Sequence, residues 1–287
     1  MNTQIFVETR KRMHFSQDQL AQGICTQATL SKFERNGKVP SLKILLRLCD
    51  RLCLTLDDLF PVSQEDDSER SSVLEVAENH LLQERYQAVL LALRNLGEPT
   101  QDSTTFQLRY YFLRGYATAL GDGTLGDALY DFSQILNRLD EGHRTMFSTL
   151  AYTGMGIAYN RSGDADRAEF FFNKVANEIR NMQFNQRHNI WRALNILNYT
   201  AEYYSQRADF VSSDELLDYG VQICSRYHMT YYLARITYLK ALNALHRQDP
   251  VGPIRQELRD AEAFARLNGN QRVLSLIAGT LNQLDKQ

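Results

Sequence analysis

Between residues 16 and 41, apolar positions follow the helical period in two short runs separated by a turn. Ser16 is a favourable N-cap residue, and Gln19 stands three positions later, where a capping box places Glu or Gln. These signals predict a helix over 16–22. Gly23 ends this helix, because glycine adopts the left-handed conformation without strain.

A second helix is predicted over 26–35, with Thr26 as its N-cap and Leu30 and Phe33 on its inner face. Its polar face is free of large apolar side chains. Two short helices joined by a tight turn at this spacing are typical of a helix-turn-helix, which places its second helix in the major groove of DNA. The pattern therefore predicts DNA as a partner.

Further helical patterns surround this pair. Helices are predicted over 3–13, with Ile5, Val7 and Met13 inward, and over 41–52; Thr55 caps a short fifth helix. The inward stripe of the 41–52 helix is Leu42, Leu45, Leu46, Leu48 and Cys49. Five helices make a complete small domain, which we assign to residues 1–62. The polar, acidic run that follows predicts a linker over 63–72, which can be helical at its C-terminal end.

From residue 73 onward the apolar positions are helical to the end of the chain, and no strand pattern survives comparison with the helical template. One stretch fits the tetratricopeptide pattern aromatic–x3–Gly–x2–Tyr…Ala–x3–Phe. Its matching residues are Tyr152, Gly156, Tyr159, Gly163, Ala168 and Phe172. Weaker units precede and follow it, about 34–45 residues apart. We therefore predict an all-α protein in which 73–287 forms a right-handed tetratricopeptide-like solenoid, with a concave inner surface and a capping helix over 270–284.

The distribution of charge separates the two parts of the chain. The net charge is −2, but residues 1–60 carry nine Lys and Arg against six Asp and Glu, while the remainder carries 23 against 28. A basic region attracts phosphate, so the field that would favour DNA is concentrated in the N-terminal domain.

Candidate DNA contacts follow from the helix-turn-helix geometry, in which the first residues of the second helix face base edges. Gln27 has the donor and acceptor pair that matches adenine, and Lys32 can reach guanine or a phosphate. Gln17 begins the preceding helix and can bind phosphate. Glu34 is expected to pair with Arg10 instead. The alternative is a capped helix pair with a solvated polar face. The predicted DNA-binding residues are Gln17, Thr26, Gln27, Ala28, Thr29, Lys32, Arg35, Asn36 and Lys43.

Signals for other kinds of chemistry are weak in this sequence. The four cysteines, Cys25, Cys49, Cys53 and Cys224, lack the spacing of a metal site and are expected in the core of a protein from a reducing cytosol. No P-loop, HExxH or Gly-x-Ser-x-Gly motif occurs, so we expect no enzyme activity, cofactor or metal. No apolar run approaches the ~18 residues of a membrane span, and the N-terminus lacks a signal peptide.

Residues 1–60 resemble the XRE or lambda-repressor type of DNA-binding domain, and the run GICTQATLSKFERNGKVPS is similar to the recognition-helix stretch of that family. Joined to a tetratricopeptide-like domain, the whole chain resembles the RRNPP group, in particular the PlcR and Rgg regulators of Gram-positive bacteria. This resemblance implies a cytoplasmic quorum-sensing transcription factor. It also implies a homodimer that binds palindromic promoter DNA and a short signalling peptide on the concave surface.

The inner surface of the repeats carries amide side chains at helical spacing. An Asn can donate to a peptide carbonyl and accept from a peptide N–H. The resemblance implies this role for Asn160 and Asn198, and Arg161 or Arg235 can pair with a peptide carboxylate. The predicted peptide-binding residues are Thr153, Asn160, Arg161, Asn195, Asn198, Glu202, Arg235 and Tyr238.

Two other interpretations stay open from the sequence. The repeat domain can instead bind a protein partner, which a flat, charged groove would favour over a deep, Asn-lined one. The other is an enzyme such as a repeat-containing phosphatase, but the sequence has no cluster of nucleophiles or metal ligands to support it.

Overall fold

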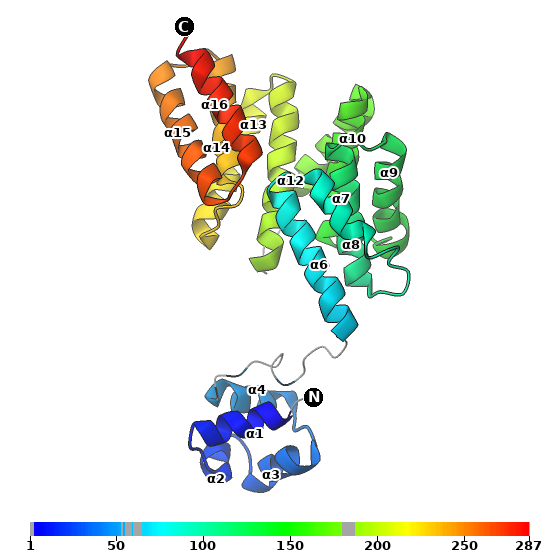
Figure 1. Ribbon diagram of the computed structural model, residues 1–287, viewed down its shortest axis with the longest axis vertical. Helices are drawn as coiled ribbons and strands as arrows, with labels where there is room; N and C mark the ends of the chain where they lie inside the picture. Colours follow the sequence, from blue (N-terminus) through cyan, green and yellow to red (C-terminus); the bar gives the residue numbers. More distant parts are fainter. Residues whose placement is uncertain (1–2, 53, 55–58, 60–64, 180–186, 287) are drawn as a thin grey trace. The chain divides into compact units, whose positions relative to one another are not determined.

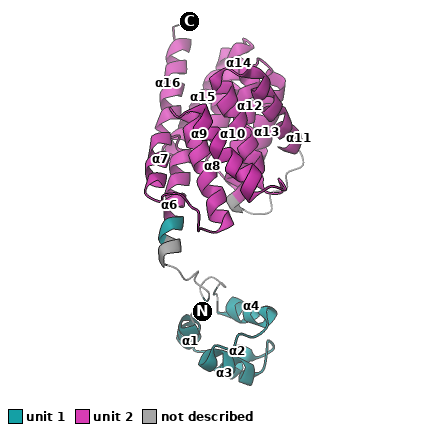
Figure 2. Cartoon of the chain, turned by 90° about the vertical axis from the view of Figure 1, so that its right-hand side faces the viewer, with its two compact units in different colours: residues 1–71 teal, residues 72–287 magenta. Residues whose placement is uncertain are grey.

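The computed structural model describes residues 3–52, 54, 59, 65–179 and 187–286. All regular secondary structure in these ranges is helical, which confirms the predicted all-α class (Figure 1). The chain divides into two compact units, residues 1–71 and 72–287 (Figure 2). In the described residues, no helix combines the length and the apolar character that crossing a membrane requires.

The first unit contains four described helices, and its predicted helix-turn-helix is present. They are α1 (Thr3–Arg12), α2 (Gln17–Ala21), α3 (Gln27–Asn36) and α4 (Leu42–Arg51). The predicted capping box is formed, since the Ser16 hydroxyl accepts from the Gln19 backbone N–H while the Gln19 side chain accepts from that of Ser16. Gly37 ends α3 in the left-handed conformation, with φ of +64°. The predicted fifth helix lies outside the described residues, apart from its Leu59.

The core of this unit differs from the predicted faces at two helices. On α1, Phe6 is fully buried against Phe33, with ring centroids 5.1 Å apart, whereas the predicted inward residues Ile5 and Val7 are only half-buried. Met13, also predicted inward, follows the helix and is exposed. On α4, Leu42 and Leu46 are exposed, so the buried stripe is narrower than predicted. A ten-residue helix that packs on one side can bury only about a third of its circumference.

The second unit consists of paired helices in chain order (Figure 1). The pairs are α6 (Glu65–Leu82) with α7 (Tyr86–Arg94), α8 (Thr104–Leu120) with α9 (Leu125–Gln134), α10 (Met146–Ser162) with α11 (Ala165–Ile179), α12 (Arg187–Gln206) with α13 (Phe210–Tyr227) and α14 (Leu233–His246) with α15 (Val251–Leu267); α16 (Gln271–Leu284) comes last. A single π-helical turn, η1 (Ile135–Leu139), extends α9. Residues 65–72 of the predicted linker are helical, because α6 begins at Glu65.

Glycine and phenylalanine hold the helices of a pair at close distance, as the repeat pattern predicts. A Cβ atom on Gly156 of α10 would lie 2.9 Å from the ring of Phe172 on α11, and one on Gly115 of α8 would lie 2.7 Å from Phe132 on α9. Phe132 also lies against Gly154 of the next pair. The rings therefore occupy space that any larger residue at these glycines would fill.

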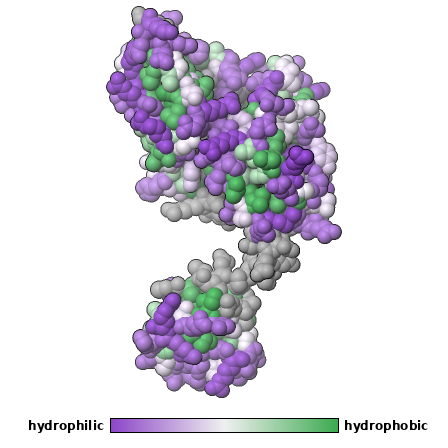
Figure 3. Space-filling model, viewed as in Figure 1, coloured by the Kyte–Doolittle hydropathy of each residue, from purple (hydrophilic) through white to green (hydrophobic). Residues whose placement is uncertain are grey.

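One large apolar core runs from α6 to α14, and a smaller one joins α14, α15 and α16. Hydrophilic residues cover most of the face seen in Figure 3, and separate apolar patches lie over α14–α16, over α6 and α7, and on the first unit. Leu276 of α16 is among the large apolar residues that remain exposed.

Candidate nucleic-acid interface and ligand groove

The helix-turn-helix is fixed from inside by a chain of polar contacts. Arg10 forms a double ion pair with Glu34, with Nε–Oε1 and Nη2–Oε2 distances of 2.6 and 2.8 Å, and donates to the carbonyl of Phe15. Gln17 donates to Glu34 at 2.7 Å, and Gln27 donates to Gln17 at 2.7 Å. The predicted Arg10–Glu34 pair is therefore present, and it anchors two of the candidate DNA-binding residues.

The other candidates lie along α3, including its N-cap, and at the start of α4. Thr26 is the N-cap of α3 and accepts from the Thr29 N–H at 3.2 Å, while the two hydroxyls lie 2.8 Å apart. These two threonines therefore shape the helix end. The remaining candidates are Ala28, Lys32, Arg35, Asn36 and Lys43, and in the described part of the chain their cations form no ion pair.

Arg51 is a functional support that the sequence pattern did not reveal. Its guanidinium donates to the carbonyl oxygens of Leu20 and Gln22, at 3.0 and 2.7 Å, at the end of α2. These carbonyls have no partner within their own helix, and a cation at a helix C-terminus also interacts favourably with the helix dipole. Arg51 therefore holds α4 to the end of α2.

Two neighbouring cavities form a groove in the second unit. The larger has a volume of about 410 Å³ and the smaller about 200 Å³. They share five lining residues, Glu84, Glu202, Gln206, Arg235 and Arg272. We call their combined lining the groove. It is built mainly from the first helices of successive pairs, together with the turn between α6 and α7 and with α16.

Six of the eight predicted peptide-binding residues line this groove, namely Asn160, Arg161, Asn198, Glu202, Arg235 and Tyr238. The other two lie in the interior. Thr153 is fully buried and donates to the Thr149 carbonyl of its own helix at 2.8 Å. Asn195 is buried and donates to the Tyr232 hydroxyl at 2.8 Å. Neither of these two residues lines the cavities.

Two buried polar atoms of the groove have no hydrogen-bond partner among the described residues. Asn198 lines the larger cavity with only 2% of its surface exposed, and its Oδ1 is unpaired. The hydroxyl of Tyr203 is unpaired in the smaller cavity, where its ring stacks on Phe172 at 4.3 Å. Buried polar groups are nearly always paired, so these two atoms are available to hydrogen-bond with a ligand or with water in the cavities. The sequence alone does not reveal an unpaired hydroxyl on Tyr203, because pairing depends on the neighbours that the fold supplies.

The arginines of the groove differ in whether a carboxylate of the protein pairs with their charge. Arg235 lies 3.2 Å from Glu84 and 3.8 Å from Glu202, so its charge is already paired. Burial raises the pKa of Glu202, and the Arg235 charge opposes that rise. Arg161 instead donates to the carbonyls of Leu120 and Gly121 at 2.7 and 3.0 Å, and no carboxylate of the described residues pairs with it. Arg161 is therefore better suited than Arg235 to bind a carboxylate from a ligand.

The far end of the larger cavity is apolar, which the sequence pattern did not predict. Phe210 stacks on His246 with ring centroids 5.7 Å apart. The other apolar lining residues are Leu239, Leu242, Val273 and Leu276. These come from α13, α14 and α16, whose convergence depends on tertiary structure. The cavity can therefore hold an apolar side chain next to the amide of Asn198.

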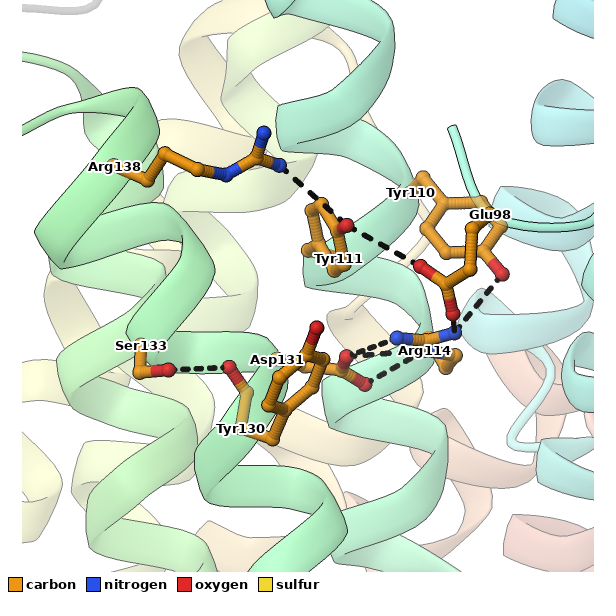
Figure 4. Close-up of polar contacts among 8 residues, drawn as sticks. All are labelled: Glu98, Tyr110, Tyr111, Arg114, Tyr130, Asp131, Ser133 and Arg138. Atoms are coloured by element: carbon orange, nitrogen blue, oxygen red, sulfur yellow. Dashed lines mark hydrogen bonds and ion pairs between the residues drawn. The ribbon is translucent and has the colours of Figure 1, made fainter. Parts of the chain in front are cut away.

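A separate polar cluster between α8 and α9 lies outside the groove lining (Figure 4). Arg114 donates to both carboxylate oxygens of the buried Asp131, with a shortest distance of 2.7 Å, and to Glu98. Arg138 donates to the hydroxyl of Tyr111. The charged groups in this cluster satisfy one another, so we assign it a structural role.

The comparisons with known proteins agree with this architecture. A helix-turn-helix family model matches residues 8–59. No curated protein has a matching sequence.

Several solved structures share the fold over nearly the whole chain. Bacillus thuringiensis PlcR in complex with the peptide PapR7 and DNA is 14% identical, covers 96% of this chain and 98% of its own, and gives a TM-score of 0.75. ComR from S. thermophilus, in complex with DNA and its signalling peptide ComS, is 16% identical, with coverages of 96% and 97% and a TM-score of 0.63. The Streptococcus dysgalactiae SHP pheromone receptor Rgg2 is 12% identical, with coverages of 99% and 99% and a TM-score of 0.59. The two-part architecture predicted from sequence is therefore the fold of these proteins.

Proposed function

We propose that this protein is a transcription regulator switched by a short signalling peptide. It binds palindromic promoter DNA as a homodimer through its helix-turn-helix and binds the peptide in the groove. The observation that carries the proposal is the unpaired amide oxygen of Asn198, buried at the wall of a cavity of about 410 Å³. The shared fold with proteins solved in complex with DNA and a peptide supports it.

The DNA-binding half rests on the exposed face of α3 and its fixed glutamines. Gln27 would read adenine, and Lys32 would reach guanine or phosphate. Arg35, Asn36 and Lys43 would contact the backbone, which positions the domain without reading sequence. In a homodimer, two such helices read half-sites about 34 Å apart, one helical turn of DNA.

The peptide-binding half rests on donors, acceptors and one uncompensated cation. Asn198 and Tyr203 would pair with the peptide backbone, and Arg161 with a carboxylate. The apolar end beyond Asn198 would hold a peptide side chain. Because these groups line concave cavities, they favour a short peptide over a folded protein partner, whose surface meets a flatter face.

The proposal places the protein in the cytoplasm, where its DNA is, and assigns it no catalytic activity, cofactor or metal. In the described ranges, no three His, Cys, Asp or Glu side chains come together as a metal site. One similar solved protein is the competence regulator ComR from Streptococcus vestibularis, which supports this assignment.

The test uses short labelled peptides encoded beside this gene, with binding measured by fluorescence polarisation. We expect one of them to bind the full chain and to change its affinity for the promoter DNA at fixed salt. Asn198→Ala should remove peptide binding and leave DNA binding without peptide unchanged. Asn282→Ala, at an exposed position of α16, is the control. Promoter affinity that is identical with and without saturating peptide would contradict the switch.

A further inference from the structure

Glu84 joins the first helix pair to the far end of the solenoid. It lies in the turn between α6 and α7, and its carboxylate is 3.2 Å from Arg235 of α14 and 3.1 Å from Arg272 of α16. Asn270, 186 positions along the chain, also donates to it at 3.4 Å. Repeats of a solenoid ordinarily contact only their neighbours. These four residues, which we call the closing cluster, therefore hold the two ends of the repeat array together.

Glu84 lies in a tight turn with a left-handed backbone. Its φ of +58° is left-handed, a conformation that glycine adopts freely and other residues adopt at a cost. The Arg85 N–H closes the turn on the His80 carbonyl at 2.9 Å. Only 6% of the Glu84 side chain is exposed. A glutamate therefore occupies a position that the turn itself would give to glycine, and its ion pairs offset the strain.

The closing cluster also forms part of the groove wall. Glu84, Arg235 and Arg272 line both cavities, and α16 adds Val273 and Leu276 to the larger one. The turn of the first helix pair and the last helix thus supply adjoining parts of the same lining. The cavities keep this shape only while the two ends are in contact.

We propose that the closing cluster couples occupancy of the groove to the position of α6. Resting on the proposed function, this inference names its regulation: a ligand in the groove and contact between the ends stabilise each other, because the ligand binds the closed arrangement better. Helix α6 runs without interruption from Glu65 to Leu82, across the boundary between the two units, and ends two residues before Glu84. A change at Glu84 therefore reaches the helix that leads to the helix-turn-helix domain.

The first test needs no ligand. Hydrogen exchange of the full chain is compared between wild type, Glu84→Gln and Arg272→Gln. We expect faster exchange at residues 80–86 and at residues 268–276 together in both variants, with the amides of α9 unchanged. Glu262→Gln, which removes an exposed ion pair to Arg266 within α15, is the control and should alter neither segment.

If hydrogen exchange becomes faster only in the segment that carries the substitution, or in neither segment, the closing cluster does not hold the two ends together. Arg272→Gln is included in case Glu84→Gln disturbs folding. The Arg272 side chain is half-exposed and lies outside the strained turn, so its substitution should leave the fold intact.

The second test measures the coupling with a pool of random heptapeptides and mass spectrometry of those retained. We expect Glu84→Gln to retain the selected peptides roughly 5- to 150-fold more weakly, the usual range for coupled sites. Adding those peptides to wild type should slow exchange at 80–86 and 268–276. Equal retention by both proteins would overturn the coupling and leave the proposed function standing. No retention by wild type would overturn the proposed function, while the exchange comparison still decides the closing contact.

Discussion

At the scale of single residues, the glutamines of the helix-turn-helix act together. The sequence suggested separate roles, with Gln17 on phosphate and Gln27 on a base. In the structure, Gln27 is tied to Gln17, which is tied to Glu34 and through it to Arg10. Fixing a glutamine side chain costs about 1.5–2 kcal/mol of rotamer entropy. Because these hydrogen bonds already fix the side chains in the free protein, DNA binding does not have to order them.

Gln27→Ala should relax discrimination at one operator position by about 1–3 kcal/mol. Because Gln17 orients Gln27, Gln17→Ala should weaken discrimination at the same position as well as general affinity. Lys43→Ala is the comparison. Loss of a phosphate contact should weaken binding to all sequences alike, and it should reduce the slope of log binding constant against log salt concentration by about 1. Competition binding on single-base operator variants at fixed salt measures all three. Uniform weakening by Gln27→Ala would contradict its role on the base.

Asp140 shows a residue-scale effect on stability. Burial alone would raise its pKa, but hydrogen bonds from the Ser148 hydroxyl and from the N–H groups of Thr145 and Arg144 together hold the pKa below its usual value. A lowered pKa in the folded state stabilises the fold above the unfolded value, near pH 3.9, and this contribution is lost as the pH falls through the folded value.

Asp140→Asn should therefore lower the free energy of unfolding by about 1.5–3 kcal/mol at neutral pH. The difference from wild type should shrink as the pH is lowered below about 4, where the carboxylate becomes protonated. Urea unfolding followed by the fluorescence of Trp191, the single tryptophan, reports on the repeat unit. A difference that stays constant between pH 7 and acid would refute the charged hydrogen bonds as its cause.

At the scale of elements, the sequence was informative where one residue ends or begins a helix. Ser16, Thr26 and Gly37 mark boundaries that local hydrogen bonds determine, so the predicted helices agree closely with α2 and α3. The helical period also identified the pairs of the second unit. It could not show how much of each helix is covered, because coverage depends on neighbours distant in sequence. Thr153 and Asn195 were expected in the groove for this reason, and the adjacent helices bury them.

Helix pairing yields a prediction with an internal control. Gly156→Ala should destabilise the repeat unit by about 1–3 kcal/mol, because its new Cβ would lie 2.9 Å from the Phe172 ring. Gly279→Ala, within α16, would place its new Cβ in open space with no heavy atom within 4 Å, and should instead stabilise by about 0.5–1 kcal/mol. Urea unfolding gives both values. Equal effects of the two substitutions would show that backbone propensity, and not the approach of the ring, governs these positions.

At the scale of the whole molecule, the proposed switch depends on linkage between the groove and the DNA interface. The local signals of the sequence predicted a DNA interface and a concave groove, but not the contact that closes the solenoid. Glu84 and Asn270 meet across 186 positions, and no local pattern reveals such a contact. The basic charge lies in the first unit, so DNA affinity should depend on that unit, and the acidic repeats should act through conformation.

Linkage requires the coupling to be reciprocal. If saturating peptide changes operator affinity by some factor, saturating operator must change peptide affinity by the same factor, typically about 5- to 150-fold. We expect the wild-type protein to give the same factor in the two titrations. In the Glu84→Gln variant, both affinity factors should approach 1, while operator affinity without peptide is retained. Fluorescence polarisation with labelled operator, and then with labelled peptide, measures the two at one salt concentration. If Glu84→Gln leaves both factors at their wild-type values, the signal travels from the groove to α6 by a route that does not include the closing cluster.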